Sequence, residues 1–205
     1  MIRANDLPMD VSVLLDPTID LPRLAEILDG LGHEGRVHAS RSWNKARQRS
    51  IYEAAKGQPI DLDFFVPPSV GSLVEVVHDL HNTLPLFSNS QKRFCKLEGE
   101  AFQLGGYNHA STNSFTGPGY FVVRMADAKD GPEHAGEVAI DYNDLPKHKP
   151  ASWPDIAPNE GLIGGLVYGR MIDFMHKVST HVAIGRAHKG KPMNEYFTLV
   201  RKDVA

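Results

Sequence analysis

The feature that most constrains the fold of this chain is a change in the spacing of its apolar residues near residue 84. Before this point, apolar residues recur every three or four positions; after it, short segments rich in valine, phenylalanine and tyrosine alternate with glycine and charged residues. The first spacing is typical of amphipathic helices and the second of strands. The sequence therefore predicts a mainly helical part, 1–83, followed by a sheet-forming part, 84–205.

Three helices are expected in the first part. Leu21–Leu31 follows Asp20, a favourable N-cap residue, and Trp43–Lys56 follows Ser42. Ser69–Asn82 carries valines and leucines at helical spacing and is expected to be the third helix. Residues 33–40, between the first two helices, are expected to form a short strand or a turn.

The second part is expected to contain about six strands and one long helix. The strands are predicted at 84–97, 101–107, 119–125, 136–142, 180–188 and 195–202. The segment Gly161–Val178 is apolar and carries several glycines, and it is predicted to be a helix that packs closely against the sheet. The expected fold is thus a single α+β domain over 1–205, with a curved antiparallel sheet around this helix.

Composition argues against several classes of protein. The net charge of −3 gives no overall field that would attract nucleic acid, and the basic row Arg41, Lys45 and Arg49 is interpreted as a solvated helix face. No apolar run approaches the ~20 residues of a membrane-spanning helix, and the N-terminus has no signal-like apolar region. The only cysteine, Cys95, is expected to be buried and structural. A soluble, cytoplasmic protein without a membrane partner is expected, and nucleic acid is not expected as a partner.

The candidate binding segment runs from Gly105 to Arg124. It places polar side chains between glycines and leads directly into a predicted strand, which is a common way to present binding groups. We expect it to form the polar rim of a largely apolar pocket for a small molecule, with Arg124 or His109 binding any acidic group. The predicted ligand-binding residues are Tyr107, Asn108, His109, Asn113, Thr116, Arg124 and His176.

An enzymatic alternative uses a histidine in the same pocket. His109 or His176 would act as general base, aided by Asp173 or Asp141. On the predicted long helix, Arg170, Asp173 and His176 are three residues apart and would lie near one another.

Two further alternatives concern metal binding and assembly. His78 and His81, three apart on a predicted helix, could hold zinc or iron together with Glu75 and one distant histidine among His109, His176, His181 and His188. The glycine face of the predicted long helix could pack on a second copy and form a homo-oligomer. The sequence identifies no cofactor and no catalytic residue, and its spacing does not select a complete metal site.

Overall fold

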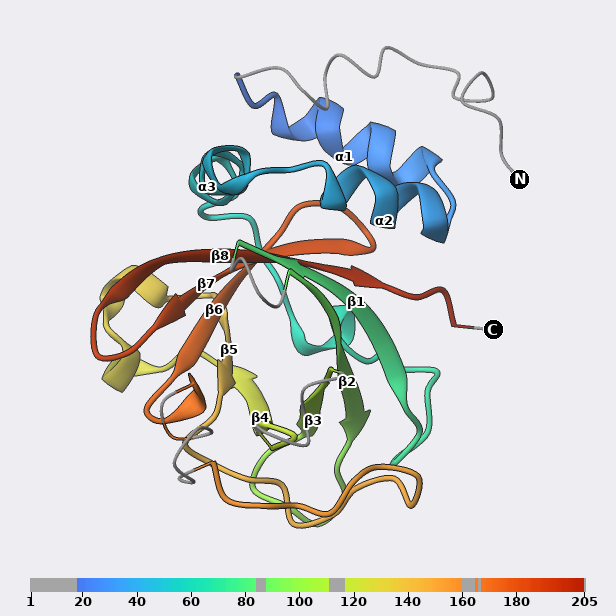
Figure 1. Ribbon diagram of the computed structural model, residues 1–205, viewed down its shortest axis with the longest axis vertical. Helices are drawn as coiled ribbons and strands as arrows, with labels where there is room; N and C mark the ends of the chain where they lie inside the picture. Colours follow the sequence, from blue (N-terminus) through green and yellow to red (C-terminus); the bar gives the residue numbers. More distant parts are fainter. Residues whose placement is uncertain (1–17, 84–87, 111–116, 160–164, 166, 205) are drawn as a thin grey trace.

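A computed structural model of the chain describes residues 18–83, 88–110, 117–159, 165 and 167–204. Its centre is a closed barrel in which each strand pairs with the next strand along the chain, and the last strand pairs with the first (Figure 1). All neighbouring pairs are antiparallel. The strands are β1 Val76–Asn82, β2 Asn89–Lys96, β3 Leu104–His109, β4 Tyr120–Met125, β5 Val138–Asp141, β6 Ile172–Lys177, β7 Val182–His188 and β8 Pro192–Arg201.

The predicted α+β class, with about six strands curved around a long helix, is wrong. The six predicted strands correspond to β2, β3, β4, β5, β7 and β8, but β1 and β6 lie in segments for which the sequence predicts helices. These two additional strands close the sheet, because β1 pairs with both β2 and β8, and β6 joins β5 to β7. The sheet is thus a closed barrel whose interior holds the inward side chains of its own strands, and not a curved sheet packed around a helix.

The helix prediction fails at β6 because both faces of this strand are covered. Asp173 and Met175 point into the barrel, whereas Phe174 and His176 point outward and are buried by other parts of the chain. A strand that is buried on both faces loses the alternation of apolar and polar residues, and its apolar run resembles a buried helix. The interpretation of 161–178 as one helix, and the homo-oligomer contact built on its glycines, therefore lose their basis.

The helix prediction over 69–82 fails for a different reason. The valines and leucines at 70, 73, 74 and 77 suggest a helical period, but in β1 the buried side chains are Val76, His78 and Leu80, which alternate. Val74 is about half exposed, and Leu73 has a left-handed φ of 55° that no helix tolerates. Pairing with two neighbouring strands outweighs the local helical spacing.

Three helices lie together on one outer side of the barrel, over β7 and β8 (Figure 1). They are α1 Leu21–Gly30, α2 His33–Arg41 and α3 Lys45–Ala54. The prediction of α1 is confirmed, including its cap: the Asp20 carboxylate accepts a hydrogen bond of 3.1 Å from the Arg23 amide. The second predicted helix is also present as α3, although Asn44 rather than Ser42 caps it. The prediction of a strand or turn at 33–40 is wrong, since α2 occupies this segment.

The predicted basic row does not lie on one helix, because Arg41 belongs to α2 and Lys45 to α3. Lys45 pairs with Glu195 at 2.9 Å, which ties α3 to β8. The helices bury an apolar layer against the outer face of the barrel, made by Leu24, Leu28, Ile51, Tyr52, Val182, Ile184, Tyr196 and Val200.

One end of the barrel is filled by residues 60–66, which include the short 3-10 helix η3 Leu62–Phe64 (Figure 1). Phe64 and Phe65 pack among the inward side chains, and two polar groups hold them there. The Arg201 guanidinium donates a hydrogen bond of 2.7 Å to the Phe64 carbonyl, and the His78 ring donates one of 2.9 Å to the Phe65 carbonyl. This end is therefore a packed core of apolar side chains.

A proline-rich segment between β5 and β6 covers the outside of β2, β3 and β4. Trp153 in this segment packs on Tyr107 and Tyr120, and its indole N–H donates to Glu75. Cys95 is buried in the same outer cluster, which confirms its predicted structural role. Burial raises the pKa of its thiol to about 12, so it stays protonated at neutral pH.

The close contacts of Gly106 in β3 provide a test of the barrel packing. A Cβ at this position would lie 2.3 Å from the Arg93 carbonyl oxygen and 2.5 Å from the Phe121 ring. We expect Gly106→Ala to lower the free energy of unfolding by about 1–3 kcal/mol. Gly71→Ala is the control, because its nearest neighbour is a Val74 methyl at 3.7 Å, and we expect a change within about 0.5 kcal/mol. Urea unfolding measures both, and equal values would contradict the packing.

Acid should destabilise the fold through His78. Burial, with weaker repulsion from Arg201, His181 and His33, lowers the pKa of its ring to about 3. Since the unfolded ring has a pKa near 6.5, the contribution to stability is complete above pH 6.5 and is lost as the pH falls from there toward 3. His176 and His188, whose pKa values are lowered to about 4 mainly by burial, act in the same direction.

His78→Gln keeps an N–H donor for the Phe65 carbonyl but does not titrate. We expect the loss of unfolding free energy between pH 7 and pH 5 to be about 2 kcal/mol smaller in this variant than in the wild type. Urea unfolding at the two pH values measures the difference. The same pH dependence in both proteins would show that His78 is not buried as a neutral ring.

Candidate functional site

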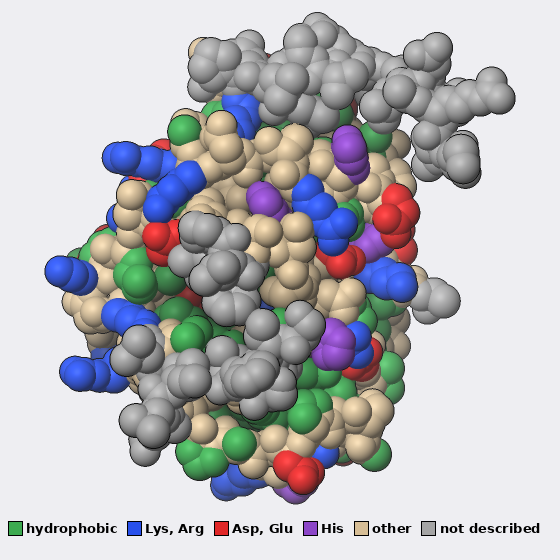
Figure 2. Space-filling model, in the orientation of Figure 1, with side chains coloured by type: hydrophobic (Ala, Val, Ile, Leu, Met, Phe, Trp, Pro, Cys, Tyr) green, Lys and Arg blue, Asp and Glu red, His purple; other side chains and the backbone are tan. Residues whose placement is uncertain are grey.

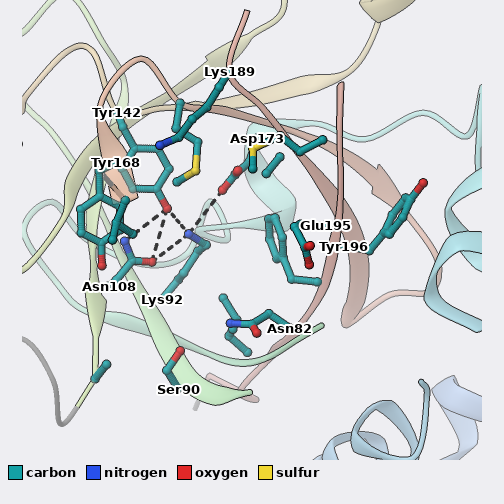
Figure 3. Close-up of a pocket in the computed structure, with 17 residues that line it drawn as sticks. Asn82, Ser90, Lys92, Asn108, Tyr142, Tyr168, Asp173, Lys189, Glu195 and Tyr196 are labelled. Carbon is teal, nitrogen blue, oxygen red and sulfur yellow. Dashed lines mark hydrogen bonds and ion pairs between the residues drawn. The ribbon is translucent and has the colours of Figure 1, made fainter. Parts of the chain in front are cut away.

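A cavity of about 310 Å³ occupies the half of the barrel opposite the filled end. Most of its wall is apolar. The apolar wall residues are Leu80, Ala110, Val167, Met171, Ala187, Met193 and Phe197. Four polar side chains from different strands or strand ends converge in it: Lys92, Asn108, Tyr142 and Asp173 (Figure 3). Barrels of eight strands have an interior that is either filled by side chains or able to hold one small ligand, and this barrel does both.

Lys92 points into the barrel because it shares the inward face of β2 with Phe94. Its side chain is 3% exposed, so the ammonium group has left bulk water. The ammonium donates a hydrogen bond of 2.8 Å to the Asn108 side-chain oxygen and another to the Tyr142 hydroxyl. It also lies 3.5 Å from a carboxylate oxygen of Asp173. A buried cation with three oxygen partners is thus held at one place in the cavity.

Asp173 comes from β6, across the barrel from Lys92. Its side chain is also 3% exposed. One carboxylate oxygen, Oδ2, faces Lys92, but the other, Oδ1, is buried without a hydrogen-bond partner among the residues that the structure describes. An unpaired buried acceptor costs about 1–3 kcal/mol, so a hydrogen-bond donor brought to this oxygen would be stabilised.

Burial changes the proton affinities of both members of the pair. It lowers the pKa of Lys92, an effect that the Asp173 carboxylate opposes. It raises the pKa of Asp173, against the lowering influence of Lys92 and Tyr142. Both shifts favour the uncharged forms, so moving a proton from the ammonium to the carboxylate is easier here than in water. The same burial raises the pKa of the Tyr142 hydroxyl well above its usual value, which keeps it protonated.

Asn108 and Tyr142 are themselves held in position. The Asn108 amide donates hydrogen bonds of 3.0 Å to the Gly119 carbonyl and 3.2 Å to the Tyr142 hydroxyl. The Tyr142 ring stacks on Tyr168, with centroids 5.3 Å apart. Gly119 has a left-handed φ of 55°, and a Cβ there would lie 2.5 Å from the Tyr168 ring. Glycine at 119 is therefore required for this close packing.

The predicted binding segment 105–124 divides between the two faces of the barrel. Asn108 lines the cavity, whereas Tyr107 and His109, one position to either side, point outward and contact each other at 3.1 Å. This division follows from the alternation of side chains along β3. Asn113 and Thr116 lie outside the described residues. Of the predicted set, Asn108 is the residue that the structure places with Lys92 and Asp173.

Arg124, predicted to bind an acidic group of a ligand, already has acidic partners within the protein. On the outer face of β4 its guanidinium lies 2.5 Å from Asp130 and 2.8 Å from Asp141. These hydrogen bonds raise its pKa and lower that of Asp130. Arg124 thus links β4 and β5 to the loop between them, and Asp141 takes part in this network instead of the cavity.

His176, another predicted ligand-binding residue, also lies outside the barrel. Its ring packs on Tyr52 of α3 with centroids 4.5 Å apart, and one ring nitrogen is 3.4 Å from Glu137. Asp173 faces inward on the same strand, so the predicted grouping of Arg170, Asp173 and His176 on one helix face does not form. The residues lining the cavity within the described chain include no histidine.

The structure also separates the histidines of the metal hypothesis. His78 and His81 lie on opposite faces of β1: His78 is bonded to the Phe65 carbonyl inside the barrel, and His81 contacts Ser88 and Asn89 outside. The histidines visible on the face drawn in Figure 2 lie apart from one another. Among the described residues, no three His, Cys, Asp or Glu side chains are grouped so that they could hold a metal ion.

One pattern in the sequence could have identified Lys92, which the predicted site did not include. In β2, Lys92, Phe94 and Lys96 share a face opposite Arg93 and Cys95, so burial of Phe94 inside a barrel implies that Lys92 is inside as well. A lysine on an apolar face is a candidate functional group, but only the barrel shows that this face is internal. Asp173 was predicted only as an aid to a histidine base, and the prediction of its segment as a helix gave no indication that it lies beside Lys92.

Fold and cavity together define a closed up-and-down β-barrel with an interior site of ligand size. Comparison of the chain with protein-family models, with curated proteins and with solved structures gave no match. None of the helices in the described part of the chain is long and apolar enough to cross a membrane.

The free energy of unfolding should fall far more when one member of the Lys92–Asp173 pair is replaced than when both are replaced. Lys92→Met leaves the Asp173 carboxylate buried without its cation, and we expect a loss of about 3–5 kcal/mol of unfolding free energy. The double variant Lys92→Met/Asp173→Leu removes both charges at similar volume and should regain most of this loss. Lys177→Met, at an exposed position of β6, is the control and should change little. Urea unfolding at pH 7 measures all three, and a double variant less stable than the single one would contradict the coupling.

Proposed function

We propose that this protein binds one small, mainly apolar molecule inside the open half of its barrel, with a hydrogen-bonding group of that molecule placed against Lys92 and Asp173. The observation that carries the proposal is the convergence of four buried polar side chains, Lys92, Asn108, Tyr142 and Asp173, in a mainly apolar cavity of about 310 Å³ (Figure 3). Apolar walls with a few converging polar groups are typical of small-molecule sites.

The distribution of polar groups supports an end-on orientation of the ligand. The Leu80, Met171 and Phe197 side chains offer apolar contact for the body of the molecule. The Lys92 ammonium already has three oxygen partners, whereas Asp173 Oδ1 has none among the described residues. A hydroxyl or amine on the ligand would supply the donor that this oxygen lacks.

The enzymatic alternative with a histidine base receives no support from the cavity, because both candidate bases, His109 and His176, face outward from the barrel. The titratable groups that line the cavity are two lysines, two carboxylates and three tyrosines: Lys92, Lys189, Asp173, Glu195, Tyr142, Tyr168 and Tyr196.

Two alcohols of different shape, 2-naphthol and 1-octanol, test the proposal. Both have an apolar body and one hydroxyl donor. We expect at least one of them to bind with one-to-one stoichiometry, measured by isothermal titration calorimetry. Ala187→Phe should weaken that binding at least tenfold, because Ala187 lies directly opposite Asp173 in the pairing of β6 with β7 and lines the cavity.

Ala128→Phe is the matched control, since Ala128 is exposed in the 3-10 helix η4 Ala128–Asp130, away from the cavity. This variant should bind as the wild type does. Equal binding by the Ala187→Phe variant, or no binding of either alcohol at millimolar concentration, would contradict the proposal.

A further inference from the structure

We propose that Lys92 captures an aldehyde or ketone with an apolar body as a covalent imine inside the barrel, a reaction that rests on the small-molecule site proposed above. The amine, a proton acceptor and a stabilising cage for the product all meet at one point of the cavity (Figure 3). Each of the three is given by the position of particular side chains.

The first requirement is an amine that a ligand in the cavity reaches. Lys92 lines the cavity, and its ammonium is held by the Asn108 oxygen at 2.8 Å and by the Tyr142 hydroxyl. Asn108 is fixed in turn by the Gly119 carbonyl. Asn108 and Tyr142 are positioning residues, because they hold the nitrogen at a fixed place beside the apolar wall.

The second requirement is a group that takes a proton from the ammonium, since only the neutral amine attacks a carbonyl carbon. Asp173 Oδ2 lies 3.5 Å from the Lys92 nitrogen. Burial lowers the pKa of Lys92 and raises that of Asp173, so the proton transfer between them is less unfavourable than in water. The second carboxylate oxygen, Oδ1, is buried and without a partner among the described residues, and it can accept the hydroxyl hydrogen of an addition intermediate.

The reaction balances without any further reagent. The ammonium gives one proton to Asp173, and the neutral amine adds to the carbonyl carbon as the oxygen gains the second nitrogen proton. The resulting carbinolamine has one new C–N bond. Asp173 then returns its proton to the hydroxyl group, the C–O bond breaks, water leaves, and a protonated imine remains beside the regenerated carboxylate.

The third requirement is stabilisation of this cationic product. The Lys92 nitrogen lies 5.1 Å, 4.9 Å and 5.3 Å from the ring centroids of Phe121, Tyr142 and Phe197. Rings at these distances attract a cation through their faces, and the protonated imine keeps its positive charge on the same nitrogen. The cage and Asp173 therefore suit the product as well as they suit the ammonium, and the small apolar cavity limits the water that would hydrolyse the imine.

Reductive trapping tests the proposal. The native protein is incubated with hexanal and sodium cyanoborohydride, which reduces a protonated imine to a stable secondary amine, and the modified lysines are identified by peptide mass spectrometry. We expect the initial rate of alkylation at Lys92 to exceed that at the exposed Lys177 at least tenfold. This comparison is made within one wild-type sample and does not depend on a variant that folds.

The variant Asp173→Asn tests whether the reactivity of Lys92 requires proton transfer to Asp173 or only the burial of Lys92 in the cavity. The amide keeps the volume and hydrogen-bonding capacity of the carboxylate but does not accept the ammonium proton. Removing the carboxylate also favours the neutral form of Lys92, because Asp173 opposes the lowering of the Lys92 pKa by burial. A fall in the alkylation rate therefore reports the lost transfer and return of the proton, and we expect a fall of at least tenfold at Lys92 and no change at Lys177. An unchanged rate at Lys92 would overturn the role assigned to Asp173.

Protein unfolded in urea is the detection control, because Lys92 and Lys177 should then react at similar rates. If both peptides are modified in urea but Lys92 reacts no faster than Lys177 in the native protein, the imine proposal is wrong. Binding of 2-naphthol in that case would leave the non-covalent site intact. Loss of alcohol binding, with no preferential alkylation, would instead remove the site itself.

Discussion

Pairing of β1 with β8 is the constraint on which the rest of this structure depends. It joins the first and last strands and leaves the sheet without a free edge, so every strand has two neighbours. Closure also creates two environments that an open sheet does not separate. Inside, the side chains of eight strands face one another; outside, the helices α1 to α3 and the proline-rich segment each cover part of the wall.

The interior is divided between stability and function. Residues 60–66 enter one half and complete an apolar core with Phe94, Phe121 and Met175. The other half keeps a cavity with the Lys92–Asp173 pair, which contributes little to stability because removing two charges from water costs about as much as their attraction returns. A costly pair beside free space suits the binding, and the covalent capture, of a small molecule that we propose. The packed half supplies the rigidity that keeps these groups in place.

Sequence reasoning worked best where local chemistry decides the structure. The Asp20 cap located α1, and six strands were recognised from their alternation and their glycine-rich boundaries. It failed where burial on both faces removes the alternation, as in β6, where Phe174 and His176 are covered from outside while Asp173 and Met175 are covered from inside. The errors in the site follow directly. With β6 interpreted as a helix, Asp173 and His176 were placed together, although a strand puts them on opposite faces.

The sequence by itself determined that the chain carries short helices followed by antiparallel strands, that Cys95 is buried, and that Asn108 belongs to a segment able to present polar groups. These properties depend on nearest neighbours along the chain and on composition. Only the tertiary structure decided that the sheet closes and that Lys92 and Asp173, 81 positions apart (173 − 92), share one cavity. Closure and the position of these two side chains depend on the strand order and on which face of each strand points into the barrel. Both are set by contacts between residues far apart in the sequence.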